Sequence, residues 1–306
     1  MLPSASITAD LAAKWQNDLG SRQMNEFSET TNRGTLYLVA TPIGNLGDIS
    51  QRAREILEQA GAVACEDTRR TGKLLEHLGL RARRLLVANE HTEVSIGSTV
   101  TGLLDEGHDV ALVSDAGTPA ISDPGERLVK YVSEGGYRVS VAPGPTAAVA
   151  ALVLSGLPTN RWAMEGFLPR KGKEREIRLA SIAAETRTTV LFESPRRLRV
   201  TLRDLANFCG GDRPAAVMRE LTKLYEETAR GTLTELGTRF SGDVKGEIAI
   251  VVGGAPPIEV DDETVVAALR EELGSGATRR ASIDRVSTTL GVARNRVYAL
   301  ALAVEE

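Results

Sequence analysis

The segment Ser114-Asp115-Ala116-Gly117-Thr118-Pro119 places an acid beside small residues and a proline. A carboxylate such as that of Asp115 can hold a ribose or an ammonium group, while glycine lets a ligand approach the main chain and proline adds rigidity. The alternative is that Asp115 and Asp123 only cap helices, a common use of aspartate. The first interpretation predicts a binding loop built mostly from backbone.

Two further segments, residues 36–48 and 139–147, also run from an apolar strand into a Gly/Pro turn that opens a helix. In an open α/β sheet, ligands bind beyond the carboxyl ends of the strands, where helix N-termini offer backbone N–H groups. The first turn, Gly44-Asn45-Leu46-Gly47, is not G-x-G-x-x-G, and the chain has no P-loop motif. A nucleoside ligand other than a dinucleotide or a nucleoside triphosphate fits these loops better.

The chain has few residues that could serve as soft metal ligands. The only cysteines, Cys65 and Cys209, lie far apart and lack the spacing of a zinc site or a disulfide framework. The only histidines are His77, His91 and His108. We therefore expect no bound metal.

The charge balance favours a local rather than a global interaction with a polyanion. The 306 residues carry a formal net charge of −4, which argues against bulk electrostatic binding of nucleic acid. Basic residues nevertheless cluster at 69–73, 81–84, 170–178 and 196–199. One such cluster is ordinarily a solvated helix face, but four of them favour a polyanionic substrate.

The sequence contains neither a membrane-helix segment nor a signal-peptide pattern, which predicts a cytoplasmic protein. The longest apolar run, residues 147–154, is much shorter than the roughly 20 residues of a membrane helix. Residues 1–33 are polar and lack the pattern of a signal peptide, so we expect a flexible extension there.

The pattern of elements predicts an α/β protein of two domains with a helical tail. Residues 34–156 alternate strands and helices, which is typical of a mostly parallel sheet covered on both faces. Residues 157–254 mix strands and helices and predict a second α/β domain of mixed strand direction. Residues 258–306 predict a helix-turn-helix-like tail with arginines on its polar faces, or equally a dimerisation or capping element.

Several motifs resemble those of the small-subunit ribosomal RNA methyltransferase I family, in the right order from about Thr35 to Gly253. They are ATPIGNLGD at 40–48, EDTR at 66–69, SDAGTP at 114–119, SDPG at 122–125, PGP at 143–145, EGFLP at 165–169, FES at 192–194 and RELTK at 219–223. The chain departs from the family at 89–93, where it reads NEHTE instead of the frequent His-x-His-Asn-Glu. That departure weakens any scheme that needs the first histidine as a base.

The resemblance implies a tetrapyrrole-methylase-like fold, the class III S-adenosylmethionine (SAM) methyltransferase architecture, with SAM bound in a folded shape between two domains of a homodimer. It also implies 2′-O-methylation of a cytidine in the decoding region of 16S rRNA, in the 30S subunit. The residues that it places against SAM are Pro42, Asp115, Ala116, Gly117, Thr118, Ser122, Thr146, Ala147, Phe192, Glu220, Gly246 and Glu247.

Methyl transfer to a ribose hydroxyl needs in-line alignment and is helped by a base that takes the proton. The candidates for that base are Glu66, Asp67, Glu193 and His91. Each carboxylate could instead form an ion pair with a neighbouring arginine, and for Glu66 and Asp67 the two roles are equally well supported. Guanidinium groups bind phosphate and stack on bases, so the expected RNA contacts are Arg69, Arg70, Arg196 and Arg197.

Two other functions remain open from the sequence. One is a C-methyltransferase acting on a corrinoid precursor, on the same fold. The other is a non-catalytic nucleic-acid-binding protein that uses the helical tail.

Overall fold

The computed structural model describes residues 33–89, 91–256 and 260–303. The chain divides into two compact units between Gly253 and Gly254. The expected extension at 1–33 lies outside the described residues except for Arg33. No described helix is long and apolar enough to cross a membrane.

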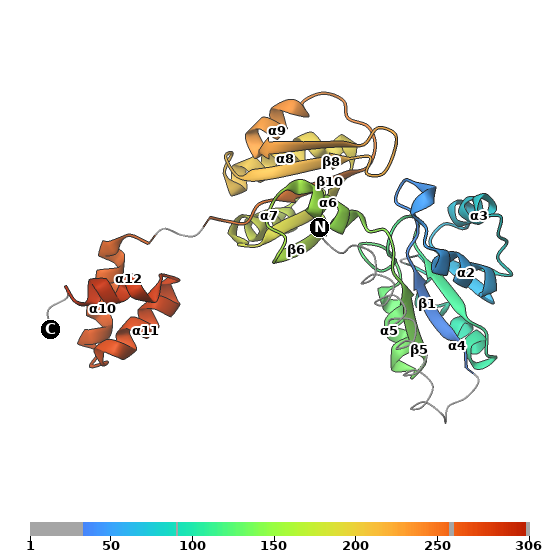
Figure 1. Cartoon of the computed structure of the whole chain (residues 1–306), viewed down its shortest axis with the longest axis horizontal. Helices are drawn as coiled ribbons and strands as arrows, with labels where there is room; N and C mark the ends of the chain where they lie inside the picture. Colours follow the sequence, from blue (N-terminus) through green and yellow to red (C-terminus); the bar gives the residue numbers. More distant parts are fainter. Residues whose placement is uncertain (1–32, 90, 257–259, 304–306) are drawn as a thin grey trace, which may run out of the picture. The chain divides into compact units, whose positions relative to one another are not determined.

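The first sheet is fully parallel and has the strand order β3-β2-β4-β1-β5. Figure 1 shows it in blue to green. The strands are β1 (Thr35–Val39), β2 (Ala62–Cys65), β3 (Leu85–Val87), β4 (Val110–Val113) and β5 (Arg138–Ala142). The prediction of a parallel sheet in this part of the chain is confirmed.

Helices cover both faces of this sheet, because its strands are apolar on both sides. Side chains of a strand alternate between faces, and β4 follows this rule. Its Val110 and Leu112 pack with α4 (Gly97–Asp105) and α5 (Glu126–Glu134), whereas Ala111 and Val113 pack with α2 (Gln51–Gln59) and α3 (Thr68–His77). A short 3-10 turn, η1 (Leu46–Asp48), follows β1.

Neighbouring strands β1 and β4 form a topological switch point. The chain leaves β1 for β2 on one side and leaves β4 for β5 on the other. The loops after two such strands diverge and open a crevice at their carboxyl ends, which is where ligands of open α/β sheets bind. The loops in question contain the motifs at 40–48 and 114–119.

The second sheet is mixed, as predicted, in the order β6-β7-β10-β8-β9. Only β6 and β7 pair in parallel. Its strands are β6 (Trp162–Phe167), β7 (Thr188–Glu193), β8 (Pro214–Arg219), β9 (Glu227–Thr232) and β10 (Ile248–Val252).

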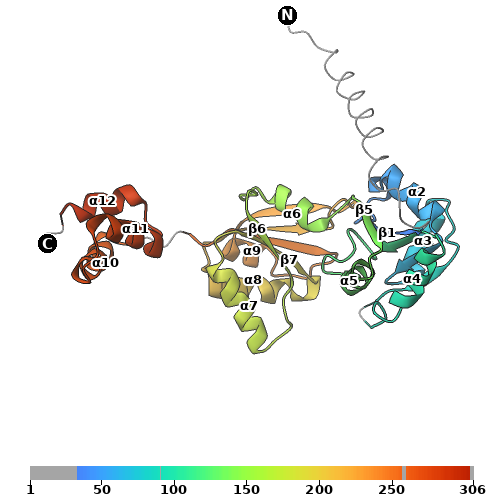
Figure 2. The same ribbon diagram turned by 90° about the horizontal axis from the view of Figure 1, so that it is seen from below.

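One face of the second sheet carries α7 (Lys173–Ala184), α8 (Pro195–Cys209) and α9 (Leu233–Arg239), and the other carries α6 (Ala147–Ser155). Figure 2 shows α6 on the opposite side of this sheet from α7 and α8. Helix α6 comes before the expected boundary at residue 156, yet it packs on the second sheet. The exact domain limits at 156 and 254 stay predictions.

The C-terminal unit is a bundle of α10 (Asp262–Gly274), α11 (Arg279–Leu290) and α12 (Arg294–Ala301) around an apolar core. Gly291, in the left-handed conformation that ends many helices, separates α11 from α12. Three of the arginines expected on the polar faces form ion pairs inside the unit, namely Arg285, Arg294 and Arg296.

Candidate cofactor and substrate site

Hydrogen bonds join the three loops that follow β1, β4 and β5. The backbones of Thr41 and Gly117 exchange two hydrogen bonds, of 2.9 and 3.1 Å. The hydroxyl of Thr118 donates to the carbonyl of Pro145 at 3.1 Å. The loops at the switch point therefore form one connected wall.

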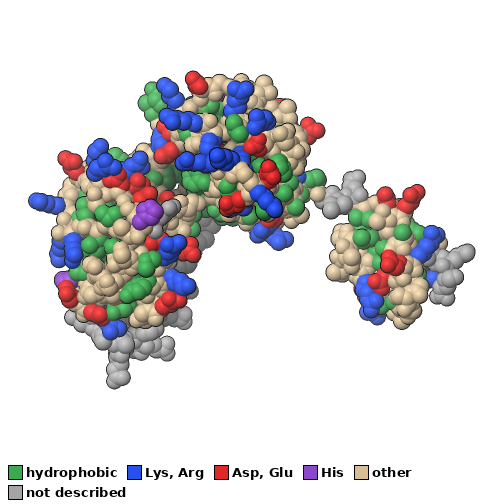
Figure 3. All heavy atoms as spheres, turned by 180° about the vertical axis from the view of Figure 1, so that it is seen from behind, with side chains coloured by type: hydrophobic (Ala, Val, Ile, Leu, Met, Phe, Trp, Pro, Cys, Tyr) green, Lys and Arg blue, Asp and Glu red, His purple; other side chains and the backbone are tan. Residues whose placement is uncertain are grey.

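This wall and the second sheet enclose a cavity of about 380 Å³. Figure 3 shows the hollow between the two α/β lobes, with lysine and arginine side chains on the surfaces beside it. Nine of the twelve residues expected against SAM line it: Ala116, Gly117, Thr118, Ser122, Thr146, Ala147, Phe192, Gly246 and Glu247. The other three, Pro42, Asp115 and Glu220, are each adjacent in sequence to a lining residue.

Backbone strain is concentrated around this cavity. Ala120, Ser122 and Glu220 adopt positive φ angles of 67°, 60° and 54°, which are uncommon for residues other than glycine. Gly246 has a φ of 96°, and a Cβ there would stand 2.4 Å from Cγ of Glu220. Such strained positions cluster at binding sites, where the surrounding structure compensates for their cost.

One oxygen beside the cavity is left for a ligand. Oδ2 of Asp115 pairs with Nη1 of Arg70 at 3.2 Å, while Oδ1 is buried and accepts no hydrogen bond within the described chain. A buried acceptor without a donor is costly, so its place is consistent with a ribose hydroxyl or an ammonium group of a ligand. The apolar part of the wall includes Ile43, Phe192 and Ile248, which suits an aromatic base.

A lysine connects the two acids of the opposite wall. Nζ of Lys223 lies 2.9 Å from Oε1 of Glu220 and 2.9 Å from Oε2 of Glu247. The hydrogen bond from Lys223 lowers the pKa of Glu220. These two expected cofactor residues thus lie together on either side of Lys223.

Glu193 lines the cavity, but its carboxylate is occupied. It is 3% exposed, and it accepts hydrogen bonds from the backbone N–H of Ser194 at 2.7 Å and from Thr201 at 2.6 Å. The guanidinium of Arg197 lies 3.4 Å away. A carboxylate with these partners is a structural anchor rather than an available proton acceptor.

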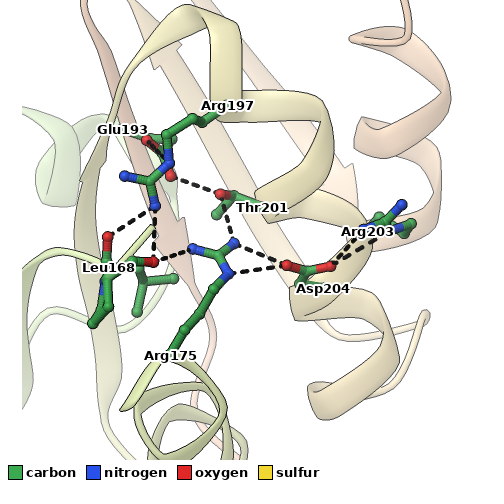
Figure 4. A network of polar contacts seen from close by, with 8 residues as sticks. Leu168, Arg175, Glu193, Arg197, Thr201, Arg203 and Asp204 are labelled. Carbon is green, nitrogen blue, oxygen red and sulfur yellow. Dashed lines mark hydrogen bonds and ion pairs between the residues drawn. The ribbon is translucent and has the colours of Figure 1, made fainter. Parts of the chain in front are cut away.

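Figure 4 shows that Glu193 belongs to a larger buried network. Arg197 also donates to the carbonyls of Leu168 and Pro169, at 2.8 and 3.2 Å. Arg175 from α7 donates to Pro169, to Thr201 and to Asp204, at 2.9 to 3.1 Å. The network fixes the ends of β6 and β7 at the cavity, and it uses Arg197, which the sequence assigned to RNA, for this purpose.

The acids after β2 lie outside the cavity lining. Asp67 caps α3 and receives two hydrogen bonds from the side chain of Arg69, which hold the pKa of its carboxyl well below the usual range. A carboxylate with a lowered pKa is a weak proton acceptor. Glu66 and His91 also do not line the cavity, and the main-chain N–H of His91 binds the side chain of Asn89. The structure therefore does not bring these three base candidates to the ligand site.

The sequence analysis missed Asp123 as a site residue. It lines the cavity, and burial raises the pKa of its carboxyl to about 6, partly offset by a hydrogen bond from Ser114. The only signal in the sequence was its place in SDPG, directly after Ser122, which had been assigned to the cofactor. Phe167, which is 54% exposed and lies in tilted contact with Phe192, also lines the cavity and was not assigned a role.

The fold and this site define a class of methyltransferases. Residues 35–237 match the family model described as tetrapyrrole (corrin/porphyrin) methylases, and the chain belongs to that family. A solved cobalt precorrin-4 methyltransferase has a TM-score of 0.55, with 20% identity over 74% of this chain and 98% of its own. A uroporphyrin-III C-methyltransferase from Thermus thermophilus, solved in complex with S-adenosyl homocysteine, has a TM-score of 0.51, with 20% identity over 71% and 97%. At these identities the likeness shows the fold.

More similar relatives define the branch of the family. A protein of Synechocystis is 42% identical over 89% of this chain and 99% of its own length. Proteins of Micromonospora olivasterospora and Escherichia coli O157:H7 are 44% and 45% identical, over 91% and 76% of this chain and 88% and 82% of theirs. All three are named ribosomal RNA small subunit methyltransferase I, and the chain belongs to the family of these enzymes.

Proposed function

We propose that this protein transfers a methyl group from SAM to the 2′-hydroxyl of a cytidine in the decoding region of 16S rRNA, in the small ribosomal subunit. The observation that carries the proposal is the gathering of nine expected SAM residues around one cavity. It is supported by the names of relatives that are 42 to 45% identical over most of this chain. We further propose that the reaction takes place in the cytoplasm.

The residues around the cavity fit the methyl donor. The backbone of Ala116, Gly117 and Thr118 would hold it from the first sheet, Thr146 and Ala147 from the start of α6, and Phe192 with Gly246 and Glu247 from the second sheet. The unpaired Oδ1 of Asp115 and the close approach at Gly246 agree with a polar ligand that lies against the main chain. When bound, SAM supplies an electrophilic methyl group on a sulfonium.

The chain contributes mainly position to the reaction. Displacement at a methyl carbon needs the attacking oxygen, the carbon and the leaving sulfur in line, and correct placement can account for about 7–11 kcal/mol of the barrier. The hydrogen bonds Thr41–Gly117 and Thr118–Pro145 fix one wall, and the network around Glu193 fixes the other. Both walls are therefore set before the RNA binds.

Exposed arginines are suited to the RNA backbone. The side chain of Arg69 is 87% exposed and that of Arg70 is 65% exposed, both on α3. Arg196 is exposed near the start of α8, whereas Arg197 points into the network described above. We propose phosphate or base contacts for Arg69, Arg70 and Arg196, and a positioning role for Arg197.

We further propose that the enzyme is a homodimer. Val149 and Val153 on α6 are 43% and 63% exposed, and Val141 on the edge strand β5, which directly precedes α6, is 46% exposed. Val149 and Val153 lie four residues apart and therefore on one face of α6, and exposed apolar side chains that lie together favour a protein partner.

Transfer of radiolabelled methyl from SAM to 30S subunits that lack this modification tests the proposed function. The expected result is one labelled methyl per subunit, found as 2′-O-methylcytidine when the labelled nucleotide is mapped. Absence of transfer to 30S subunits and to free 16S rRNA, together with transfer to a uroporphyrin-type substrate, would instead establish the C-methyltransferase.

The charge of the C-terminal unit argues against a non-catalytic nucleic-acid-binding function. Residues 254–306 contain nine acidic and six basic residues, and at least three of the six basic side chains form ion pairs within the unit. Binding of nucleic acid normally requires a net basic surface. Methylation that persists after removal of residues 261–306 would place the function in the α/β unit.

A further inference from the structure

The cavity contains one acid that the proposed SAM contacts leave unused. Of the acids that line it, Glu193 is held by Thr201, Ser194 and Arg197, and Glu247 is held by Lys223. Asp123 is the third lining acid. Within the described residues, no cationic side chain lies within 4 Å of its carboxylate, and the nearby hydroxyl of Ser114 offsets part of the rise in its pKa.

The position of Asp123 is set by a strained loop. The preceding residue, Ser122, has a φ of 60°, and Ala120 has a φ of 67°. Two residues later the N–H of Gly125 donates to Oε2 of the buried Glu93 at 2.8 Å, which ties the start of α5 to the turn before α4. A loop that is strained and anchored in this way holds a side chain at one place, which is what catalytic positioning requires.

The neighbours of Asp123 mark a second region of the cavity. A Cβ at Gly166 would stand 3.2 Å from Oγ of Ser122, so the loop before α5 lies against the end of β6. Phe167, the next residue of β6, is 54% exposed and presents an aromatic surface. An exposed aromatic ring beside an acid suits a nucleotide whose base stacks and whose ribose hydroxyl approaches the carboxylate.

Resting on the proposed function, we propose that Asp123 is the catalytic base that accepts the proton of the ribose 2′-hydroxyl. The O–H bond breaks as its proton passes to a carboxylate oxygen of Asp123, and the oxygen forms a bond to the methyl carbon of SAM. The carbon–sulfur bond breaks, and its electron pair stays on sulfur, which becomes a neutral thioether. The product is the 2′-O-methyl ribose, and Asp123 later returns its proton to water.

Burial supports this role. It raises the pKa of Asp123 to about 6, so the carboxylate is a better proton acceptor than an ordinary aspartate and is still mostly ionised at neutral pH. The charged groups around it are Asp115 on its own wall, which is paired with Arg70, and Glu193 and Glu247, which line the same cavity. Asp115 adds to the upward shift in the pKa of Asp123.

The test compares Asp123→Asn with Asp212→Asn, an exposed aspartate in the turn between α8 and β8. For Asp123→Asn we expect kcat for 30S methylation to fall by about 10²-fold or more, with the Kd for SAM, measured by calorimetry, changed less than threefold. Asp123→Glu should recover part of the rate, and Asp212→Asn should match the wild type. The wild-type kcat should rise with pH through about 6 and then level off.

Three results would overturn the proposal. Asp123→Asn could retain its kcat, it could lose only affinity for SAM, or the wild-type rate could show no rise near pH 6. Wild-type protein is measured in the same assay, so failure of the proposed function is seen separately, as absence of transfer by the wild type. In that case the base assignment falls with the function on which it rests.

Discussion

The loops of the first sheet leave acceptors available at the cavity, whereas the second sheet satisfies its own acids with cations. Asp115 keeps a buried oxygen without a donor, and Asp123 has no cation within 4 Å among the described residues. On the other wall, Glu193 and Glu220 are held by Arg197 and Lys223. The contrast indicates that one wall supplies reacting and recognising groups and that the other supplies a rigid frame.

The largest expected effect comes from breaking the frame. In Arg175→Met a buried cation is removed, which takes away the donor to Thr201 and one of the donors to Asp204 and to the carbonyl of Pro169. Removal of one partner of a buried pair costs about 3–5 kcal/mol, and urea denaturation should show a loss in that range. Arg203→Met is the matched control, because Arg203 binds the same Asp204 but is 67% exposed, and it should cost less than about 1 kcal/mol. Equal losses of unfolding free energy in the two variants would contradict the view that the buried network around Arg175 makes this wall rigid.

A smaller effect is expected at Gly246, where the second wall lines the cofactor cavity. In Gly246→Ala the new methyl group collides with Glu220, and the left-handed backbone adds about 1–2 kcal/mol of strain. We expect the Kd for SAM to rise about tenfold. Gly242→Ala, in the same loop and with no neighbouring atom within 4 Å of the added Cβ, should bind SAM as the wild type does. Unchanged affinity in Gly246→Ala would remove this loop from the cofactor site.

Loss of Arg69 should separate RNA binding from SAM binding. Its pair with Asp67 is exposed and contributes little to stability. Arg69→Ala should raise KM for 30S subunits about tenfold and leave the Kd for SAM unchanged, which steady-state kinetics and calorimetry can measure. If both constants change equally, the division between RNA-binding and cofactor-binding residues is wrong.

The smallest expected effect is that of Asp123→Asn on the free energy of unfolding. Because its folded-state pKa is raised, the carboxyl of Asp123 favours the unfolded state increasingly as pH rises from about 4 to above 6. Asp123→Asn removes this cost and should gain about 1 kcal/mol at pH 7.5, after allowance for solvent screening, and nothing at pH 4. Thermal unfolding at the two pH values measures it, and a less stable variant at pH 7.5 would indicate a structural role.

The sequence predicted most elements because local patterns determine them. The alternation of apolar strands and helices predicted both sheets, and a local residue, Ser50, caps α2 by accepting from the N–H of Ala53. Helix starts depend on side-chain caps and turns that the alternation of apolar segments does not specify. Helix α3 begins at Thr68, directly after its cap Asp67, and α4 begins at Gly97, after turns at residues 91–96 that start at Asn89.

The candidate site was predictable only where backbone loops form it. Gly117, Thr118 and Ala147 lie in motifs whose spacing already indicated a ligand loop. The states of Asp123 and Glu193 depend on how the folded chain buries and surrounds each carboxylate. Burial between two sheets raises the pKa of one, and donors from α8 occupy the other. No local pattern distinguishes these two acids.

The central claim is that the cavity between the two walls holds SAM. Ala147→Phe places a ring in the cavity at the first turn of α6, and Ala180→Phe adds the same ring at an exposed position of α7. The direct measurement is calorimetric titration of SAM into the wild type and both variants. The account predicts binding of one SAM per chain to the wild type and to Ala180→Phe, with binding to Ala147→Phe reduced at least tenfold. Equal binding by all three proteins would contradict it.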